Sequence, residues 1–222
     1  MYKLYIIWII IHISKRMVII CRHGQTEWNR AWKLQWSQDS PLTQVWVVQA
    51  LQVSHILEWV YPKVQKIFSS PQGRALSTSK ILANTLALPH SSILQDDLLK
   101  EMSFWEHEWL HKHLRKEGIL WEQMQARDAD PYNVSFPWGE NYSEVRDRAR
   151  QFIQTADIDS ASIIVAHEAF NRMLLWMLWN CSDNQALEIS QPNDVVYRYQ
   201  FGNIYHKRVD SDGKWTPWFL KK

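Results

Sequence analysis

The residues Arg22-His23-Gly24 place a guanidinium and an imidazole directly after an apolar run. A buried charge is costly unless a partner neutralises it, so Arg22 needs either a carboxylate within the fold or an anionic ligand. A second apolar run leads to Arg74, and a third ends in His167. These four cationic or hydrogen-bonding side chains are the types that bind a phosphate-like dianion, provided that the fold brings them together.

The elements that must position these side chains can be read from hydrophobic patterning. Three short, β-branched runs indicate buried parallel strands; they lie at 17–21, 66–71 and 161–167. Near-helical spacing of apolar residues predicts four helices; they cover 41–59 with Thr43 as N-cap, 74–86 ending before Pro89, 143–155 with Ser143 as a cap candidate, and 170–179. Two late strands, 194–201 and 204–209, flank a turn at Gly202-Asn203.

Strands that alternate with helices predict an α/β fold, a three-layer α/β/α sandwich with a mostly parallel central sheet. In such sheets ligands bind at the carboxyl ends of the strands. Because Arg22, His23, Arg74 and His167 all follow strand ends, we expect them to converge at one edge of the sheet. The sequence therefore predicts a phosphate-binding pocket there.

Six motifs resemble one known family, in that family's order, over about residues 17–200. They are RHGQTEWN (22–29), DSPLTQ…QA (39–50), SSPQGRALST (69–78), LLKEMSF (98–104), GENYSEVRDR (139–148) and IIVAHEAFNR (163–172). The chain resembles the histidine phosphatase superfamily in its phosphoglycerate mutase-like branch. The resemblance implies the phosphoglycerate mutase-like fold, with a single domain over 17–222.

The resemblance also implies catalytic roles. His23 is the expected nucleophile that takes the phosphoryl group on a ring nitrogen, and neighbouring cations would keep it neutral. Arg22 and Arg74 would hold the phosphoryl oxygens through charge-assisted hydrogen bonds. His167 would add a donor that stabilises the transition state. Glu101 would protonate the leaving alkoxide and then activate water, which requires a raised pKa.

The same resemblance places substrate contacts at Asn29, Gln35 and Trp36, in addition to Arg22, Arg74 and His167. No metal and no other cofactor is expected, because arginines neutralise the phosphate. His107 and His111 stand four residues apart and could bind zinc on a helix. They lack a third ligand and the HExxH order, so we favour a solvated or substrate-facing segment. The basic run 112–116 could select a substrate with a second anionic group, although such runs are more often solvated helix faces.

The leading functional hypothesis is a metal-independent phosphomonoester hydrolase that acts on a small phosphorylated metabolite through a phosphohistidine. Two alternatives stay open: a phosphoglycerate mutase using the same histidine, and a non-catalytic phosphate-binding homologue. The segment between Glu101 and His167 is shorter than in cofactor-dependent mutases of the family, which favours the phosphatase. Nothing in the sequence names the substrate.

Charge and cysteine usage restrict the partners. The net charge is +2, from 25 basic and 23 acidic residues, without the basic excess that nucleic-acid binding normally requires. The two cysteines, Cys21 and Cys181, form neither a disulfide framework nor a zinc site, so a reducing cytoplasm is expected. Residues 1–16 are apolar between basic flanks, and their run from 4 to 13 is shorter than the roughly 20 residues of a membrane-spanning helix. We favour an extra strand or an extension before Met17 over a signal or a membrane tether; among assemblies, base rates favour a homodimer.

Tryptophan and glycine contents are unusual. The chain has 14 tryptophans and 6 glycines, whereas average usage would give about 16 glycines in this length. Tryptophan stands where the resembled family usually has glycine, at 32, 36, 46, 105, 109, 138 and 176. One hypothesis is a UGA codon that the organism reads as glycine but that was translated as tryptophan; the alternative is that the tryptophans are real and fill a lipid-facing or aromatic surface. Trp36 and Trp105 would lie near the mouth of the pocket.

Overall fold

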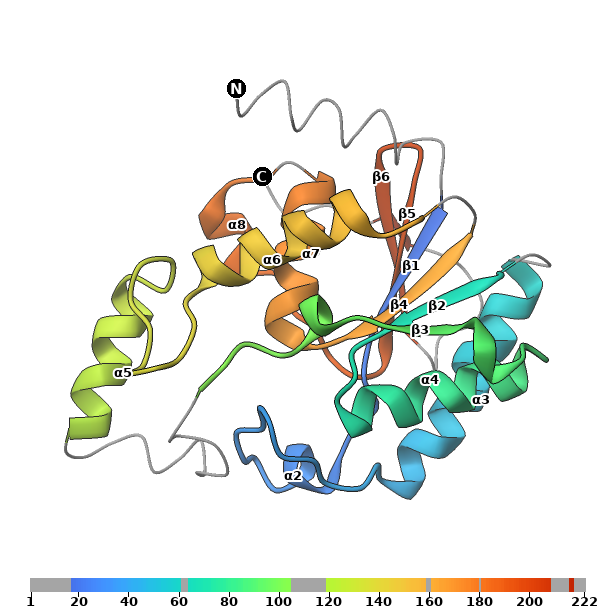
Figure 1. The fold of residues 1–222 in the computed structure, drawn as a ribbon, viewed down its shortest axis with the longest axis horizontal. Helices are drawn as coiled ribbons and strands as arrows, with labels where there is room; N and C mark the ends of the chain where they lie inside the picture. Colours follow the sequence, from blue (N-terminus) through green and yellow to red (C-terminus); the bar gives the residue numbers. More distant parts are fainter. Residues whose placement is uncertain are drawn as a thin grey trace.

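A central sheet of seven strands organises the part of the chain that the computed structural model describes, residues 17–60, 64–104, 119–158, 161–179, 181–208 and 216–217 (Figure 1). The strand order is β3-β2-β4-β1-β5-β6-β7. The strands are β1 (Met17–Arg22), β2 (Lys66–Ser69), β3 (Ile93–Gln95), β4 (Ser162–Ala166), β5 (Val195–Gln200), β6 (Asn203–Arg208) and β7 (Thr216–Pro217).

One half of this sheet is parallel and the other half is antiparallel. β3, β2, β4 and β1 pair in parallel, with Ile20 beside Ile164 and Ile164 beside Phe68. β5 then runs antiparallel to β1, placing Tyr197 beside Ile20, and β6 and β7 continue antiparallel. The predicted α/β class is confirmed. The parallel half carries the strand ends that the site requires, so the pocket prediction depends only on that half.

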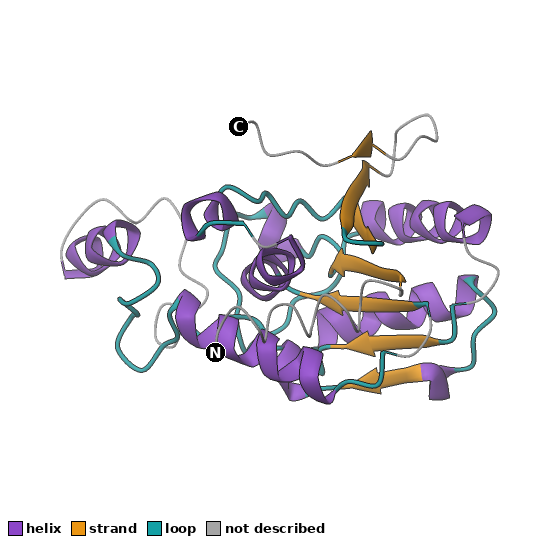
Figure 2. Ribbon diagram, turned by 90° about the horizontal axis from the view of Figure 1, so that it is seen from above, coloured by secondary structure: helices purple, strands orange, loops and turns teal. Residues whose placement is uncertain are grey.

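Helices lie on both sides of the sheet, as the predicted three-layer arrangement requires (Figure 2). They are α2 (Glu27–Arg30), α3 (Gln44–Val60), α4 (Gly73–Thr85), α5 (Ile119–Ala129), α6 (Tyr142–Thr155), α7 (Glu168–Trp179) and α8 (Asp183–Leu187), with 3-10 turns at His90–Ser92 and Asp97–Leu99. Two hydrophobic cores, one on each face, hold these layers together.

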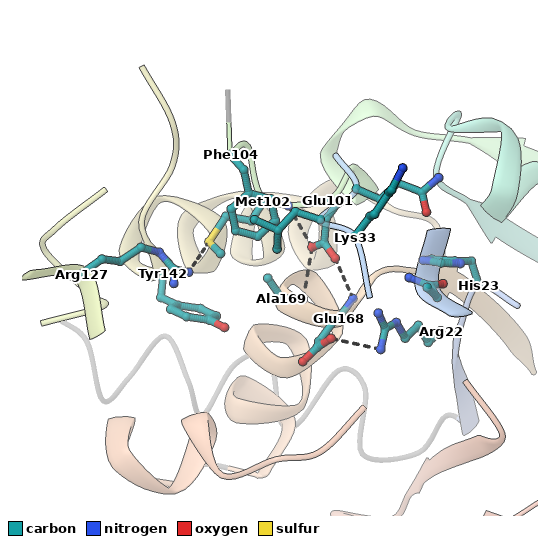
Figure 3. Close-up of a pocket in the computed structure, with 13 residues that line it drawn as sticks. Arg22, His23, Lys33, Glu101, Met102, Phe104, Arg127, Tyr142, Glu168 and Ala169 are labelled. Carbon is teal, nitrogen blue, oxygen red and sulfur yellow. Dashed lines mark hydrogen bonds and ion pairs between the residues drawn. The ribbon is translucent and has the colours of Figure 1, made fainter. Parts of the chain in front are cut away.

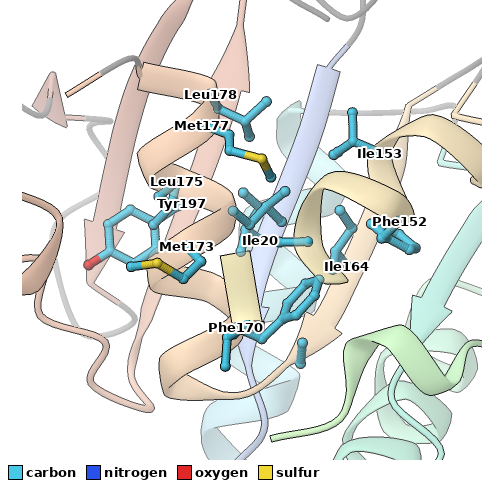
Figure 4. Close-up of a cluster of buried hydrophobic side chains, with 14 of the residues drawn as sticks. Ile20, Phe152, Ile153, Ile164, Phe170, Met173, Leu175, Met177, Leu178 and Tyr197 are labelled. Atoms are coloured by element: carbon cyan, nitrogen blue, oxygen red, sulfur yellow. The ribbon is translucent and has the colours of Figure 1, made fainter. Parts of the chain in front are cut away.

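The larger core lies between the sheet and helices α6 and α7 (Figure 4). Ile20 and Ile164 contribute from the sheet, while Phe152 and Phe170 pack edge-on with ring centroids 6.0 Å apart. Fully burying a side chain of this size stabilises the fold by about 1.5–3 kcal/mol. This core fixes α7, whose first turn reaches the site.

The smaller core lies on the other face, beneath α3 and α4. Ile19 and Val165 project into it because side chains alternate between the two faces of a strand. They meet Ala50 of α3 and Leu82 of α4, and Trp46 is buried beside them. This packing fixes the start of α4, which carries Arg74.

Most predicted elements are confirmed to within a few residues, but three details differ. The Asn141 side chain, not Ser143, caps α6, because it accepts the Glu144 N–H while Glu144 returns a bond to the Asn141 N–H. The β5–β6 turn is at Phe201-Gly202, where both residues have positive φ, 50° and 76°. Helices α2, α5 and α8 and strands β3 and β7 occupy segments in which the sequence analysis predicted no element.

Several predictions fall outside the described residues. These are the leader 1–16, the His107/His111 pair, the basic run 112–116, Trp105 and Trp109. Within the described part of the chain, no helix combines the length and the apolar character needed to cross a bilayer.

Candidate active site

His23 is fixed at the carboxyl end of β1 by its own backbone. Its N–H donates to the Ala166 carbonyl at 2.9 Å, and the Asn193 amide donates to its carbonyl at 2.7 Å. The ring Nδ1 lies 2.7 Å from the Gly24 carbonyl oxygen, which can only accept, so Nδ1 carries the hydrogen. In the neutral ring, Nε2 therefore holds the lone pair that a nucleophile needs.

Burial and nearby cations keep His23 neutral. Its pKa is well below the usual 6.5, first because burial penalises the charged form and then because Arg74 and Arg22 repel a second positive charge. The prediction that cations would keep this imidazole neutral agrees with the direction of the shift, although desolvation is the larger cause.

Gly24 packs closely against Trp46 of α3. A Cβ atom at Gly24 would lie 1.7 Å from an indole carbon of Trp46, so no side chain fits at this position. The Gly24 N–H donates to the Thr78 hydroxyl of α4 at 2.9 Å. The loop after His23 is thus held between α3 and α4.

Arg74 enters the site from the first turn of α4 and is buried. Its Nη1 donates to Asp39 at 2.8 Å, and its Nη2 donates to the Trp36 carbonyl at 2.9 Å. The second Asp39 carboxylate oxygen accepts the Gly73 N–H at 2.6 Å, at the start of α4. Burial lowers the Arg74 pKa, while the hydrogen bond to Asp39 opposes that shift. The loop 36–39 therefore orients the Arg74 guanidinium. The positive charge of this group lowers the pKa of His23.

His167 follows β4 and faces His23. The ring centroids of the two histidines lie 5.1 Å apart, and His167 Nε2 lies 2.9 Å from the Ser70 hydroxyl oxygen. Its Nδ1 is buried without a partner among the described residues. Burial is also the main reason why its pKa is well below 6.5, with further contributions from Arg74 and His23.

Glu101 lies at the start of α7, where its carboxyl group accepts three backbone N–H groups. The donors are Met102 at 2.9 Å, Glu168 at 3.1 Å and Ala169 at 3.2 Å, the last two from the first turn of the helix. Burial raises the Glu101 pKa, against the opposing effects of the Met102 hydrogen bond and of Arg22. A buried carboxyl group with a raised pKa is suited to general acid catalysis.

Arg22 has both an internal partner and a ligand-facing position. It forms an ion pair with Glu168 at 3.0 Å and donates to the Gln191 carbonyl at 2.8 Å. Glu168 also pairs with Arg172 at 3.1 Å. The carboxylate that the opening motif calls for is therefore Glu168, which the sequence analysis did not assign to the site although it directly follows His167.

A cavity of about 270 Å³ is shared by Arg22, His23 and Glu101 (Figure 3). Five of the predicted site residues line it: Arg22, His23, Asn29, Gln35 and Glu101. Asn29 and Gln35 also have structural partners, since the side-chain oxygen of Asn29 accepts the Thr26 N–H at 3.2 Å and that of Gln35 accepts the Thr26 hydroxyl at 2.9 Å. The other predicted residues, Arg74, His167 and Trp36, lie outside this wall, and Trp36 reaches Arg74 through its carbonyl oxygen.

The sequence analysis missed several residues of the cavity wall. Besides Glu168, these include Lys33, Phe104, Arg127 and Tyr142. Arg127 lies on α5 and Tyr142 on α6, helices whose approach to the strand ends is a matter of tertiary packing. The GENYSEVRDR motif contains Tyr142 but gives no indication that this ring faces the pocket.

Comparison with known proteins places this geometry in a family. The model of the histidine phosphatase superfamily (branch 1) matches residues 18–207. The chain belongs to that superfamily, as its motifs indicate.

Individual relatives agree with this assignment. The chain is 31% identical over 164 residues to a Hydrogenobacter thermophilus protein with the provisional name phosphoserine phosphatase 2, covering 69% of this chain and 73% of that one. It is similar in fold to Bacillus stearothermophilus YhfR, with a TM-score of 0.71 and 22% identity over 91% of this chain and 95% of that one. The phosphoserine phosphatase of Entamoeba histolytica, solved with 3-phosphoglyceric acid, gives a TM-score of 0.67 and 21% identity over 82% of this chain and 89% of that one. The phosphoglycerate mutase-like fold is thereby confirmed.

Proposed function

We propose that the chain hydrolyses a small phosphomonoester through a phosphohistidine on His23. The observation that carries the proposal is the presence, at one cavity, of two buried groups whose pKa values are shifted in opposite directions. His23 is held neutral with its hydrogen on Nδ1, while the pKa of Glu101 is raised in favour of the protonated acid. One group can attack phosphorus while the other can give up a proton.

In the first step, His23 Nε2 forms a bond to phosphorus as the bond from phosphorus to the ester oxygen breaks. Glu101 transfers its proton to that oxygen, and the alcohol departs. Arg22 and Arg74 balance the negative charge on the phosphoryl oxygens, and His167 donates a hydrogen bond to them. In the second step, water attacks phosphorus, Glu101 takes up a proton from that water, and inorganic phosphate leaves with the histidine restored.

The name of the Hydrogenobacter relative supports hydrolysis as the overall reaction. Release of inorganic phosphate from 3-phosphoglycerate, a sugar phosphate and an aryl phosphate, in excess chelator, tests the proposal. We expect release that His23→Ala abolishes and that His90→Ala, a substitution of an exposed histidine bonded to Asn84, leaves unchanged.

The intermediate itself provides a second readout. Rapid mixing with a 32P-labelled substrate and quenching in alkali should trap label on the protein, because the phosphorus–nitrogen bond of phosphohistidine survives alkali and breaks in acid. Transfer of the label to an added acceptor alcohol in place of water would favour the mutase alternative. Phosphate release that persists in His23→Ala would overturn the mechanism.

A further inference from the structure

Glu168 places a carboxylate in the wall of the cavity that the proposed reaction fills with a phosphoryl group. Its side chain is 35% exposed, so the charge lies at the cavity surface rather than within the core. In the proposed reaction this residue neither attacks phosphorus nor transfers a proton. A negative group beside a bound anion weakens binding, and a cavity built only to hold phosphate would therefore lack it.

The Glu168 carboxylate joins two arginines. One oxygen lies 3.0 Å from Nη1 of Arg22, the nitrogen that also donates to the Gln191 carbonyl at 2.8 Å. The other oxygen lies 3.1 Å from Nη2 of Arg172, one turn further along α7. Arg172 does not line the cavity, and its Nε donates to the Ile189 carbonyl at 3.1 Å. Glu168 is thus held from behind while it faces the arginine that the phosphoryl group needs.

The backbone of Glu168 contacts the proposed acid. Its N–H donates to Oε2 of Glu101 at 3.1 Å, and the next N–H, of Ala169, donates to Oε1 at 3.2 Å (Figure 3). One residue therefore binds Arg22 through its side chain and Glu101 through its main chain. Both functional groups of the proposed reaction are within its direct reach.

The electrostatic surroundings of Glu101 come from four elements. The titratable and charged groups that interact with it are Arg22 of β1, Arg74 of α4, Tyr142 of α6, and Glu168 and Arg172 of α7. Burial contributes most to the raised pKa of Glu101, and the Glu168 charge adds to that effect, whereas the Met102 hydrogen bond and the charges of Arg22 and Arg74 oppose it. Among these groups Glu168 is the carboxylate, so its charge works against the arginines.

We infer that Glu168 is a positioning residue that acts through Arg22 and Glu101: its charge offsets that of Arg22, so that inorganic phosphate is released and Glu101 stays an acid. Without this counter-ion, Arg22 would hold phosphate more tightly and would favour loss of the proton from Glu101. The effect on Glu101 rests on the proposed function, whereas the effect on phosphate binding does not. A residue that merely oriented Arg22 would have the opposite effect on phosphate, because its removal would weaken binding.

Calorimetric titration with inorganic phosphate at neutral pH tests the first effect. Glu168→Gln removes the charge but keeps a side-chain oxygen that can accept a hydrogen bond from one arginine. We expect the Kd for phosphate to fall by about two- to fivefold, the size of a partly exposed ion pair. An unchanged or higher Kd in a folded variant would overturn the inference.

The pH profile of hydrolysis tests the second effect. With an alkyl phosphate, the decline in rate at rising pH should move to lower pH in Glu168→Gln, since Glu101 loses its proton more readily there. The rate on p-nitrophenyl phosphate, whose leaving group needs no proton, should show no such movement. Glu168→Asp keeps the charge and should return the profile towards that of the wild type. A uniform loss on both substrates with an unmoved profile would show a structural role and contradict the effect on Glu101.

Asp157 provides a matched control. Its carboxylate forms an ion pair with Lys66 at 2.8 Å, at the start of β2, and does not line the cavity. Asp157→Asn therefore removes the same formal charge and should change neither the Kd for phosphate nor the pH profile. Glu168→Ala is a second charge-free variant at a partly exposed position, and the same two shifts are expected from it. Weaker phosphate binding in both Glu168 variants would overturn the inference independently of how either side chain packs.

The two arms separate this inference from the proposed function. If no ester is hydrolysed, the phosphate titration still reads the charge of Glu168, and tighter binding in Glu168→Gln supports its action on Arg22. If hydrolysis through His23 is confirmed while the variant binds phosphate more weakly, then the inference fails and the proposed function stands.

Discussion

The imidazole rings of His23 and His167 lie 5.1 Å apart at their centroids, and both are buried beside Arg74 and Arg22. Two basic groups at this separation cannot both be protonated cheaply in the absence of an anion. Two neutral rings backed by permanent cations would suit the phosphoryl dianion of the proposed substrate. Because these rings are neutral in the folded state, the free energy of unfolding should depend on pH, and this dependence can be measured without any substrate.

We expect stability to fall as the pH falls below about 6.5. The unfolded chain takes up protons on both histidines there, while the folded chain does not, because both folded-state pKa values are well below 6.5. The unfolded state thus binds more protons, and each ring lowers the free energy of unfolding by about 1.4 kcal/mol per pH unit. Urea unfolding at pH 7.5 and 5.5 measures the slope. A variant with glutamine at both positions should show a flatter slope; an equal slope would mean that the rings are protonated in the fold.

Glu101 should matter most where the leaving group is poor. An alkoxide needs a proton to depart, whereas nitrophenolate does not, so Glu101→Gln should lower kcat by about 10²- to 10⁴-fold on an alkyl phosphate and far less on p-nitrophenyl phosphate. Steady-state rates on both substrates provide the comparison. Glu140→Gln is unsuitable as a control variant, because Glu140 forms an ion pair with Arg148. Glu144→Gln, at the solvent-exposed cap of α6, is suitable. Equal losses on the two substrates would exclude the acid role.

The pH dependence of the alkyl reaction follows from the same carboxyl group. Burial raises the Glu101 pKa above the usual 4.5, so the protonated acid persists to higher pH than in an exposed glutamate. The rate on an alkyl phosphate should fall as the pH rises through that raised pKa. The rate on p-nitrophenyl phosphate should lack this limb, and a limb common to both substrates would assign it to a group other than Glu101.

The parts of the site that the sequence predicts are those fixed by local pattern and sheet topology. Arg22, His23 and His167 end apolar runs that could be read as parallel strands, and parallel strands bring their carboxyl ends to one edge. Arg74 follows for the same reason, because it begins the helix after β2. Their convergence is thus a consequence of topology and needs no knowledge of side-chain packing.

The residues that were missed depend on contacts between distant segments. The Gln191 carbonyl and the Asn193 amide hold Arg22 and His23 from a loop about 170 positions away, and no local pattern marks that loop. Arg127 reaches the cavity through the packing of α5 against Phe104 and Tyr142. The cap of α6 is different, since Asn141 three residues before Glu144 is a recognisable capping box.

Gly24 provides a test of how tightly the nucleophile loop is packed. A methyl group at this position would lie 1.7 Å from an indole carbon of the buried Trp46, so the backbone or the ring would have to shift. We expect Gly24→Ala to destabilise the fold by about 3 kcal/mol, the upper end of the usual range for overpacking. Denaturant unfolding of Gly24→Ala, Trp46→Gly and the double variant should show that the loss in the double variant is smaller than the sum of the two single losses by at least about 1 kcal/mol. Strictly additive losses would place the strain elsewhere.

Two of the tryptophans at family glycine positions have a backbone that favours glycine. Trp32 and Trp138 have φ values of 54° and 58°, in the left-handed region that costs about 1–2 kcal/mol for a residue with a Cβ atom. Trp36, Trp46 and Trp176 do not have positive φ. The hypothesis that UGA codons were read as tryptophan thus gains support at two positions, and the codons of the gene test it directly: UGG at those positions would refute it.

We expect Trp32→Gly and Trp138→Gly each to raise the free energy of unfolding by about 1 kcal/mol. Their side chains are 61% and 82% exposed, so little buried area is lost, while the left-handed backbone becomes free of strain. Trp121, 37% exposed within α5, is the matched control, because glycine in a helix interior should lower stability by about 0.5–1 kcal/mol. Urea denaturation of the three variants gives the comparison. If all three are destabilised alike, then contacts of the indole rings outweigh the backbone strain, and the glycine interpretation loses its structural support.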